Sequence, residues 1–130
     1  MNPDQPQPVK FYIAVRRDLA PGPQLAQAVH AAIQFSQEWP ELISPWYIDS
    51  NFLVVVSVAD EDALKELADQ ARELEIRYSI TQEPDYNDSW TAVAFQPGET
   101  ARLICACEAL ALKDAEEPKV DEWGLVVYSP

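Results

Sequence analysis

The stretch FLVVVSV, residues 52–58, is a nearly continuous run of apolar and mostly β-branched side chains. Such a run is typical of a strand that is covered on both faces inside a parallel or mixed sheet. Asp60 and a segment over residues 61–74 follow, and the apolar side chains of that segment recur every three or four positions. An Asp directly before such a segment is a favourable helix cap. The sequence therefore predicts a central strand over residues 52–58 and a helix over residues 61–74.

Three further strands are predicted around this unit. Residues 10–17 (KFYIAVRR) are aromatic and β-branched, residues 76–81 alternate apolar and polar side chains, and residues 90–96 read WTAVAFQ. The loop over residues 83–89 is too short for a parallel crossover, so the last two strands should be antiparallel neighbours. We therefore predict a single α/β domain that has a mixed four-stranded sheet with helices on both faces.

Two more helices are predicted, over residues 24–37 and 99–110. The second of these contains Cys105 and Cys107. We expect the apolar stripe of the first helix to face the sheet. That stripe comprises Leu25, Ala28, Val29, Ala32, Ile33 and Ser36, whereas Gln27, His30, Gln34 and Gln37 lie on the opposite side. Residues 39–50 hold two prolines and three aromatic side chains, which indicates an irregular connection that has room for a helical turn and is packed down by its aromatic residues.

The ends of the chain differ in composition from the predicted domain, which covers residues 10–112. Residues 1–9 are expected to form a disordered tail, because they are dominated by Asn, Asp, Gln and Pro. Residues 113–130 form an acidic extension whose Trp123–Tyr128 stretch (WGLVVY) is expected to add a short strand or to cover an apolar groove.

We find neither a secretory signal pattern nor a run of the roughly 20 apolar residues that a membrane helix needs. With two cysteines that suit a reducing compartment, we expect a soluble, cytoplasmic protein.

The chain is strongly acidic. It has 22 Asp and Glu against 9 Lys and Arg, which gives a formal net charge of −13. This charge repels phosphate backbones and anionic lipid surfaces, and no Lys or Arg lies between Arg17 and Lys65. We therefore expect weak binding to nucleic acid and no binding to membranes, although the same charge also suits a role in solubility alone.

Three short motifs together resemble the type 2 peptidyl-tRNA hydrolase family, the archaeal and eukaryotic class of these enzymes. The motifs are Arg16-Arg17-Asp18-Leu19 at the end of a strand, Ala26-Gln27 with His30-Ala31 on the next helix, and Thr91–Pro97 (TAVAFQP) in the last strand. The resemblance implies an α/β fold over most of the chain and hydrolysis of the ester that joins a peptide to tRNA. One His and two cysteines are too few ligands for a zinc site, so no metal or cofactor is predicted.

The resemblance also implies a set of site residues, of which only a part is present. The family is expected to supply a Lys at the entry of the first helix, an Asp and a Thr in a loop before the last strand, and a second Thr that opens this strand. Here Gln24 stands where the Lys would be, the loop reads QEPDY over residues 82–86, and only Thr91 matches in position and type. We predict a catalytic set of His30, Thr91 and a carboxylate from Glu83 or Asp85. The residues that we expect to contact or position the substrate are Arg16, Arg17, Asp18, Gln24 and Gln27.

Each of these residues also has a purely structural interpretation. A single His on a helix is more often a structural hydrogen-bonding residue than a base, although an imidazole that titrates near neutrality can take a proton. Glu83 and Asp85 flank Pro84, as in an ordinary turn. Two hypotheses therefore stay open: a peptidyl-tRNA or aminoacyl-ester hydrolase with a rebuilt site, and a non-enzymatic descendant of the fold. The descendant would bind a protein or a small ligand through Trp39, Trp46, Tyr86 and Trp90. The sequence also leaves open whether the chain forms a homodimer.

Overall fold

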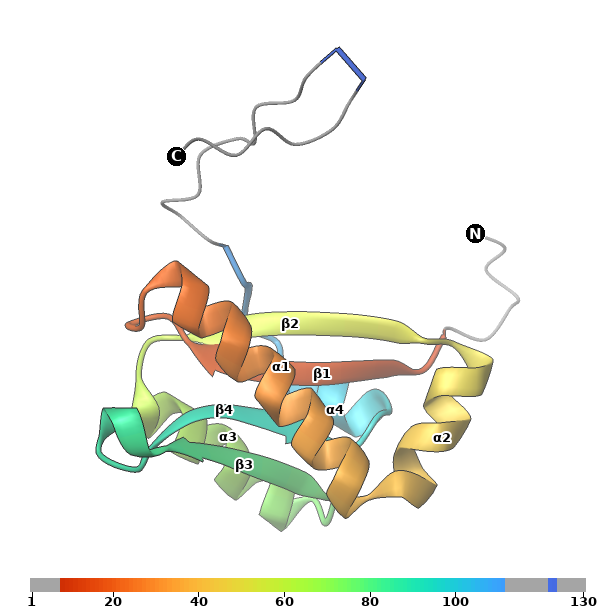
Figure 1. The fold of residues 1–130 in the computed structure, drawn as a ribbon. Helices are drawn as coiled ribbons and strands as arrows, with labels where there is room; N and C mark the ends of the chain where they lie inside the picture. The colour runs from red at the N-terminus through yellow and green to blue at the C-terminus, as the bar shows by residue number, and fades with distance from the viewer. Residues whose placement is uncertain (1–7, 112–121, 124–130) are drawn as a thin grey trace.

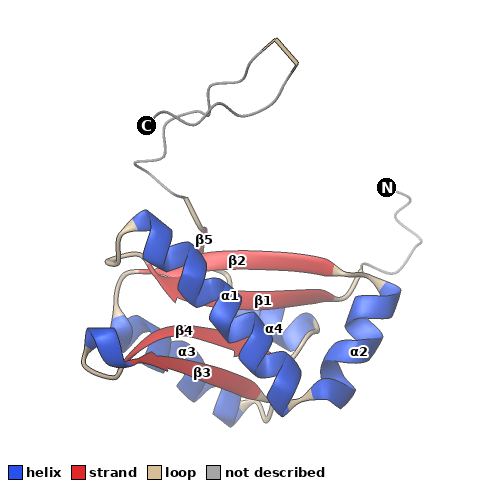
Figure 2. Cartoon of the chain, viewed as in Figure 1, coloured by secondary structure: helices blue, strands red, loops and turns tan. Residues whose placement is uncertain are grey.

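The computed structural model of the protein describes residues 8–111 and 122–123. In chain order its elements are β1 (Lys10–Arg16), α1 (Pro21–Glu38), α2 (Pro40–Asp49), β2 (Phe52–Val58), α3 (Glu61–Glu73), β3 (Tyr78–Glu83), the 3-10 turn η1 (Pro84–Tyr86), β4 (Ser89–Phe95), α4 (Glu99–Ile104) and β5 (Glu108–Ala109). The strands form one sheet in the order β3-β4-β1-β2-β5. β1 and β2 are parallel and the other neighbouring pairs are antiparallel. α1 and α2 pack on one face of this mixed sheet, and α3 and α4 pack on the other (Figures 1 and 2).

The sheet has five strands, where four were predicted. The additional strand β5 is two residues long and pairs with Val56 and Ser57 of β2. β5 lies in the stretch that was predicted as a helix over residues 99–110. The helix α4 is shorter than predicted: it ends at Ile104, and both cysteines follow it. The backbone N–H of Leu110 donates to Val55 O at 3.1 Å. That hydrogen-bond partner is distant in sequence, so a local pattern could not reveal the strand.

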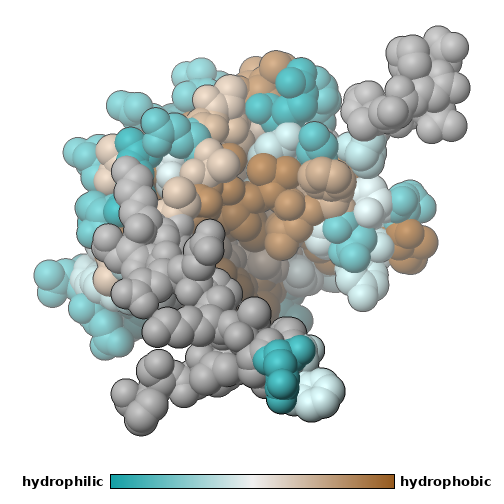
Figure 3. Space-filling view, turned by 90° about the horizontal axis from the view of Figure 1, so that it is seen from above, coloured by the Kyte–Doolittle hydropathy of each residue, from teal (hydrophilic) through white to brown (hydrophobic). Residues whose placement is uncertain are grey.

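Residues 52–58 form an internal strand, as predicted, but not the middle strand of the five. The middle strand is β1, whereas β2 has β1 on one side and only the short β5 on the other. Val56 and Val58 lie in the core, while the side chains of Phe52 and Leu53 are 46% and 48% exposed. Apolar residues gather in the middle of the face along which β2 runs (Figure 3). In this chain the continuous apolar run therefore forms a strand that is buried at its carboxyl end only.

α1 is rotated from the predicted orientation: Ala28 and Ala32 of the predicted stripe pack against the sheet, but its three large aliphatic side chains do not. The exposed fractions of Leu25, Val29 and Ile33 are 52%, 49% and 56%, so these three side chains point to solvent. The buried residues of α1 are Gln24, Gln27, Ala28, Ala31 and Phe35. The predicted orientation was wrong because the neighbouring strand β3 presents polar side chains to this helix, as described below.

α2 occupies the stretch that was expected to be irregular. Pro40 stands at its first turn, where the missing N–H costs no helical hydrogen bond, and Pro45 lies inside the helix. The ring of Trp46 packs edge-on against Phe11 with a centroid distance of 5.0 Å, and its indole N–H donates to Phe52 O at 2.9 Å. These two contacts, the first of them with a residue distant in sequence, stabilise a helix that its own composition disfavours.

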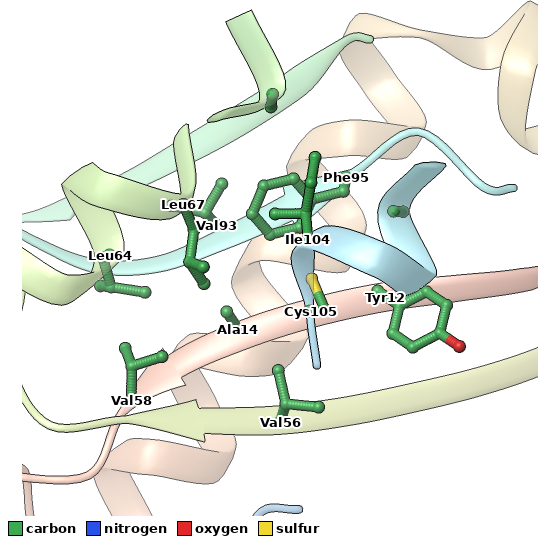
Figure 4. Close-up of a cluster of buried hydrophobic side chains, with 12 residues drawn as sticks. Tyr12, Ala14, Val56, Val58, Leu64, Leu67, Val93, Phe95, Ile104 and Cys105 are labelled. Atoms are coloured by element: carbon green, nitrogen blue, oxygen red, sulfur yellow. The ribbon is translucent and has the colours of Figure 1, made fainter. Parts of the chain in front are cut away.

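α3 agrees with the prediction, including its cap. The Asp60 carboxylate accepts a hydrogen bond from the Ala63 N–H at 3.0 Å. Leu64 and Leu67 face the sheet, where they pack with Val93 and Phe95 of β4 (Figure 4). This cluster is the core between the sheet and the α3–α4 layer.

The predictions for the two ends of the chain concern residues that are mostly outside the described part. Residues 1–7, 112–121 and 124–130 are not described, and they include nearly all of the expected tail and of the expected strand over residues 123–128. Among the residues that are described, no helix is both long and apolar enough to cross a membrane.

Candidate functional site

One end of the sheet collects most of the predicted site residues. The carboxyl ends of β1, β2 and β3 lie there, together with the start of β4 and the first turns of α1 and α3 (Figure 1). α/β proteins usually bind their ligands outside the carboxyl ends of parallel strands. We call this region the polar end, and the side chains that define it are Arg16, Asp18, Gln27, Glu61, Glu83, Ser89 and Thr91.

A row of polar side chains, which we call the polar seam, joins α1 to β3. Alternate residues of a strand share one face, and β3 turns Ser79, Thr81 and Glu83 toward α1. Their partners on the helix are Glu38, Gln34 and Gln27. The distances are 3.1 Å from Ser79 Oγ to Glu38 Oε2, 3.3 Å from Thr81 Oγ1 to Gln34 Oε1, and 3.3 Å from Gln27 Nε2 to Glu83 Oε2. These hydrogen bonds explain why α1 turns Gln27 and Gln34 toward the sheet.

Thr91 joins this region through a β-bulge in β4. Thr81 is opposite Ala92 and Gln82 is opposite Trp90, which leaves Thr91 as the additional residue. As a result, Trp90 packs on the α3 side of the sheet and Ala92 on the α1 side, with Thr91 between them. The Thr91 hydroxyl donates to Gln27 Oε1 at 2.6 Å and lies 3.3 Å from Thr81 O. Bulges often re-aim a side chain beside an active site, and this one directs a hydroxyl toward α1.

Glu83, Gln27 and Thr91 thus form one continuous hydrogen-bonded chain. The Gln27 side chain accepts from Thr91 through Oε1 and donates to Glu83 through Nε2. Gln27 is 5% exposed and Thr91 is fully buried, whereas Glu83 is half-buried. Glu83 is therefore the member of the chain that a water or ligand can reach, and Thr91 can act on it only through Gln27.

Arg16 is held by hydrogen bonds to both neighbouring segments. Its Nε and Nη2 donate to the two carboxylate oxygens of Asp18 at 2.7 and 2.8 Å, and its Nη1 donates to Ser89 Oγ and Trp90 O at 3.0 and 3.2 Å. The hydrogen bonds from Arg16 lower the pKa of Asp18, and the same bonds raise the pKa of Arg16. Arg16 therefore joins the end of β1 to the start of β4 with its charge neutralised by Asp18.

A second hollow lies at the N-terminus of α1, on the side of β2 and β5. It is a pocket of about 320 Å³ whose lining includes Arg17, Gln24, Ser57 and Glu108. Gln24 is 5% exposed and donates through Nε2 to Leu19 O and Arg17 O at 2.5 and 3.3 Å. Its Oε1 is buried and has no hydrogen-bond partner in the described part of the chain. Beside the pocket there is therefore a buried, unpaired oxygen, on the side chain that stands where the family resemblance implies a Lys.

Arg17 is the cation of this pocket. Its Nη1 donates to Ser57 O at 3.3 Å and lies 3.8 Å from Glu108 Oε2. The Arg17 side chain remains 38% exposed, and that of Glu108 is 76% exposed. A pair this exposed and this long is weak, so the guanidinium is available to an anionic ligand.

The other predicted residues lie apart from these two groups. His30 is exposed on α1, one turn after Gln27, and Asp85 is exposed in η1. Sequence reasoning missed Glu61, whose Oε2 accepts the Trp90 N–H at 2.6 Å, and Ser89, which binds Arg16. No local signal identifies these two, because their partners are distant in sequence. Over residues 8–111 and 122–123, no group of three or more His, Cys, Asp or Glu could hold a metal ion.

Three comparisons bear on the identity of this fold and site. The family model described as peptidyl-tRNA hydrolase PTH2 matches residues 9–113. No curated protein matches the chain. Among solved structures, a protein of unknown function from Agrobacterium tumefaciens strain C58 is similar with a TM-score of 0.60 and 14% identity, over 82% of this chain and 100% of that one. At this identity the likeness concerns the fold alone. Because the family model spans most of the chain, including α1 and the polar end, the chain belongs to the peptidyl-tRNA hydrolase PTH2 family.

Proposed function

We propose that this chain hydrolyses the ester bond between a tRNA and its peptidyl or aminoacyl group, with Glu83 as the general base. Membership of the PTH2 family supports the reaction. The observation that carries the choice of residues is the hydrogen-bonded chain from Glu83 through Gln27 to Thr91 at the polar end. In this proposal Gln27 and Thr91 are positioning residues, because neither reaches solvent.

In the proposed reaction a water molecule attacks the carbonyl carbon of the ester. Glu83 takes a proton from this water while the water oxygen bonds to the carbon. The tetrahedral intermediate then breaks its bond to the ribose oxygen, and the proton on Glu83 passes to that leaving oxygen. The products are a free carboxylic acid and a tRNA with a free hydroxyl. Gln27 keeps the Glu83 carboxylate in one orientation throughout, since Thr91 occupies the acceptor oxygen of Gln27.

We assign the nucleotide end of the substrate to the pocket beside α1. Arg17 would meet a phosphate there, and Gln24 would have to turn its buried, unpaired Oε1 toward the pocket to accept a hydrogen bond from a hydroxyl or amino group. Arg16 is already neutralised by Asp18, so this site offers few phosphate contacts. Each contact contributes a slope of about −0.9 to the dependence of log K on log salt for duplex nucleic acid. Binding of tRNA should therefore be weak and only slightly sensitive to salt.

A second function is favoured by the scarcity of cations. Arg16 is paired, Gln24 stands in the expected Lys position, and the chain carries a net charge of −13. These features favour a non-enzymatic descendant that binds a protein or a small ligand. Three of the aromatic side chains predicted to bind such a ligand already contact another side chain, which counts against this role for them: Trp39 lies under Arg77, Trp46 packs on Phe11, and Trp90 lies under Lys65.

Single-turnover cleavage of a peptidyl-tRNA at low salt, with protein in excess and a known family hydrolase as positive control, separates the two functions. We expect the wild-type protein to release tRNA above the uncatalysed rate. Glu83→Gln should lower the rate by about 10²-fold or more, the usual contribution of a general base. Asp88→Asn is the matched control, because it removes an exposed carboxylate from the same turn and should leave the rate unchanged.

Two results of this assay would contradict the proposal. Absence of tRNA release by the wild-type protein would favour the non-enzymatic function. Release that is unaffected by Glu83→Gln but lost in Asp85→Asn would assign the base to the other carboxylate of the loop.

A further inference from the structure

A pocket lies at the end of β1 that is opposite to the polar end. It has a volume of about 420 Å³, which is within the usual range of small-ligand sites, and its lining includes Lys10, Tyr12, Glu99 and Arg102. Lys10 and Tyr12 are alternate residues of β1 and therefore share one face of the sheet. α4 packs on that same face and supplies Glu99 and Arg102. We call this hollow the Tyr12 pocket.

The Tyr12 hydroxyl is an unused hydrogen-bonding group at this pocket. Tyr12 is 6% exposed, and the hydroxyl of a buried Tyr usually has a hydrogen-bond partner. Within residues 8–111 and 122–123 this hydroxyl has none. It points away from the other labelled side chains of the core cluster in Figure 4. Burial raises the pKa of Tyr12, with a smaller opposing effect of Arg102, so the hydroxyl is protonated near neutral pH and can donate.

Two cations line the same pocket. Lys10 forms no ion pair with any described residue, and its Nζ lies 4.9 Å from the centroid of the Phe52 ring. Arg102 is paired with Glu99, which lies 2.7 Å from its Nε and 2.5 Å from its Nη2. Both side chains of this pair are more than half exposed, so the pair is weak. The pocket therefore offers three separate donors, and Glu99 is the only carboxylate among the described residues that line it.

We propose that the Tyr12 pocket binds a phosphate group, either as the free ion or as part of a small organic monoester. The phosphate of a monoester has three terminal oxygens that accept hydrogen bonds and a charge of about −1.5 to −2 at neutral pH. The ammonium of Lys10, the guanidinium of Arg102 and the hydroxyl of Tyr12 provide one donor group for each oxygen. A carboxylate has only two oxygens and a single charge, so it matches this set less well.

The surroundings of the three donors set the expected affinity. Pro8 and Val9 form an apolar part of the lining, against which the organic part of a monoester would pack. Glu99 competes with the phosphate for Arg102, and the net charge of −13 repels any anion. We therefore expect weak binding that becomes tighter in Glu99→Gln. The inference does not depend on the proposed enzymatic activity, because that site lies at the other end of β1.

Titration with inorganic phosphate and, separately, with glycerol 3-phosphate tests this proposal, with backbone amide chemical shifts recorded at constant ionic strength. The amides of Lys10, Tyr12 and Gly98 should shift and reach saturation with both probes. Equal affinities would identify the free ion as a sufficient ligand, whereas tighter binding of glycerol 3-phosphate would show that the organic part contributes. Both results support a phosphate site.

Tyr12→Phe isolates the contribution of the hydroxyl. No described residue bonds to this hydroxyl, so its removal should leave the unfolding free energy unchanged. Phosphate binding should weaken by about tenfold or more, because one hydrogen bond to a charged group is lost. Lys10→Gln and Arg102→Gln should have effects of similar size. Arg72→Gln is the matched control: Arg72 forms the same kind of exposed pair, with Asp69 three residues away, and its loss changes the net charge equally but should leave phosphate affinity unchanged.

Three results would overturn the proposal, once circular dichroism has verified that each variant is folded. The first is the absence of saturable shifts at the Tyr12 pocket with either probe. The second is a Tyr12→Phe protein that binds phosphate as tightly as the wild type. The third is an equal loss of affinity in Arg72→Gln and Arg102→Gln, because this would indicate a general attraction of phosphate to cations rather than a site.

Discussion

Replacing Thr91 by Val should destabilise the protein by about 1–3 kcal/mol, the cost of leaving a buried polar group without its partner. The two side chains have nearly the same shape, so the substitution removes the hydroxyl and little packing. In the native structure this hydroxyl donates to Gln27 Oε1 at 2.6 Å. Gln27 is 5% exposed and its Nε2 is bonded to Glu83, so its oxygen cannot turn to water without breaking that second bond.

Urea unfolding followed by tryptophan fluorescence measures this loss, with the free energy obtained by linear extrapolation. Thr81→Val is the matched control, because its hydroxyl makes a longer contact, 3.3 Å, to an oxygen of Gln34, and Gln34 is only half-buried. Its loss should be smaller, below about 1 kcal/mol. Combining Thr91→Val with Gln27→Met removes both partners and should recover part of the stability. A Thr91→Val variant as stable as the wild type, with the same denaturant slope, would refute this account of the pair.

Three further predictions concern the ion pair of β1, the cysteines and the cap of α3. Arg16 lowers the pKa of Asp18 below its ordinary value of 3.8, so their pairing stabilises the protein above that pH, and this stabilisation is lost as the pH falls through the lowered pKa. Asp18→Asn should therefore lose less unfolding free energy than the wild type on acidification, and an unchanged slope of unfolding free energy against pH would contradict this. Burial raises the pKa of Cys105 to about 12, whereas Cys107 is only half-buried. Iodoacetamide should therefore alkylate Cys107 well before Cys105 in native protein at mildly alkaline pH, as measured by peptide mass spectrometry, and equal alkylation rates would show that Cys105 is not protected. Asp60→Ala should lower the unfolding free energy by about 1 kcal/mol, and Asp60→Asn should retain most of it, because only the second keeps a capping oxygen; identical losses in both would argue against the cap.

The elements that were predicted correctly are those specified by their own sequence neighbours. α3 has its cap at Asp60 and its apolar stripe within one segment, and β1 is a short β-branched run that ends at a turn. α2 could not be predicted, because Pro40 and Pro45 argue against a helix locally. Its stabilising contact, Trp46 with Phe11, joins residues that are distant in the chain.

The orientation of α1 could not be predicted from the helix alone. Gln27 and Gln34 face inward only because β3 brings Glu83 and Thr81 opposite them. The same limit applies to the site. The family resemblance identified Thr91 and Glu83 as candidates, but the bulge that turns Thr91 toward Gln27 depends on the pairing of two strands. Gln27 therefore appeared as a substrate contact, whereas the structure makes it the link between the hydroxyl and the carboxylate.

The central claim, that the polar end and the adjoining Arg17 pocket form the substrate site, is tested most directly by locating a bound substrate mimic. A suitable probe is adenosine that carries an aminoacyl group in a non-hydrolysable amide linkage at the 3′ position, titrated while backbone amide chemical shifts are recorded. We predict that the largest shifts fall on the amides of Gln24, Gln27 and Glu83. Shifts that gather instead around the pocket lined by Lys10 and Arg102, at the other end of β1, while the polar end stays unchanged, would contradict the claim.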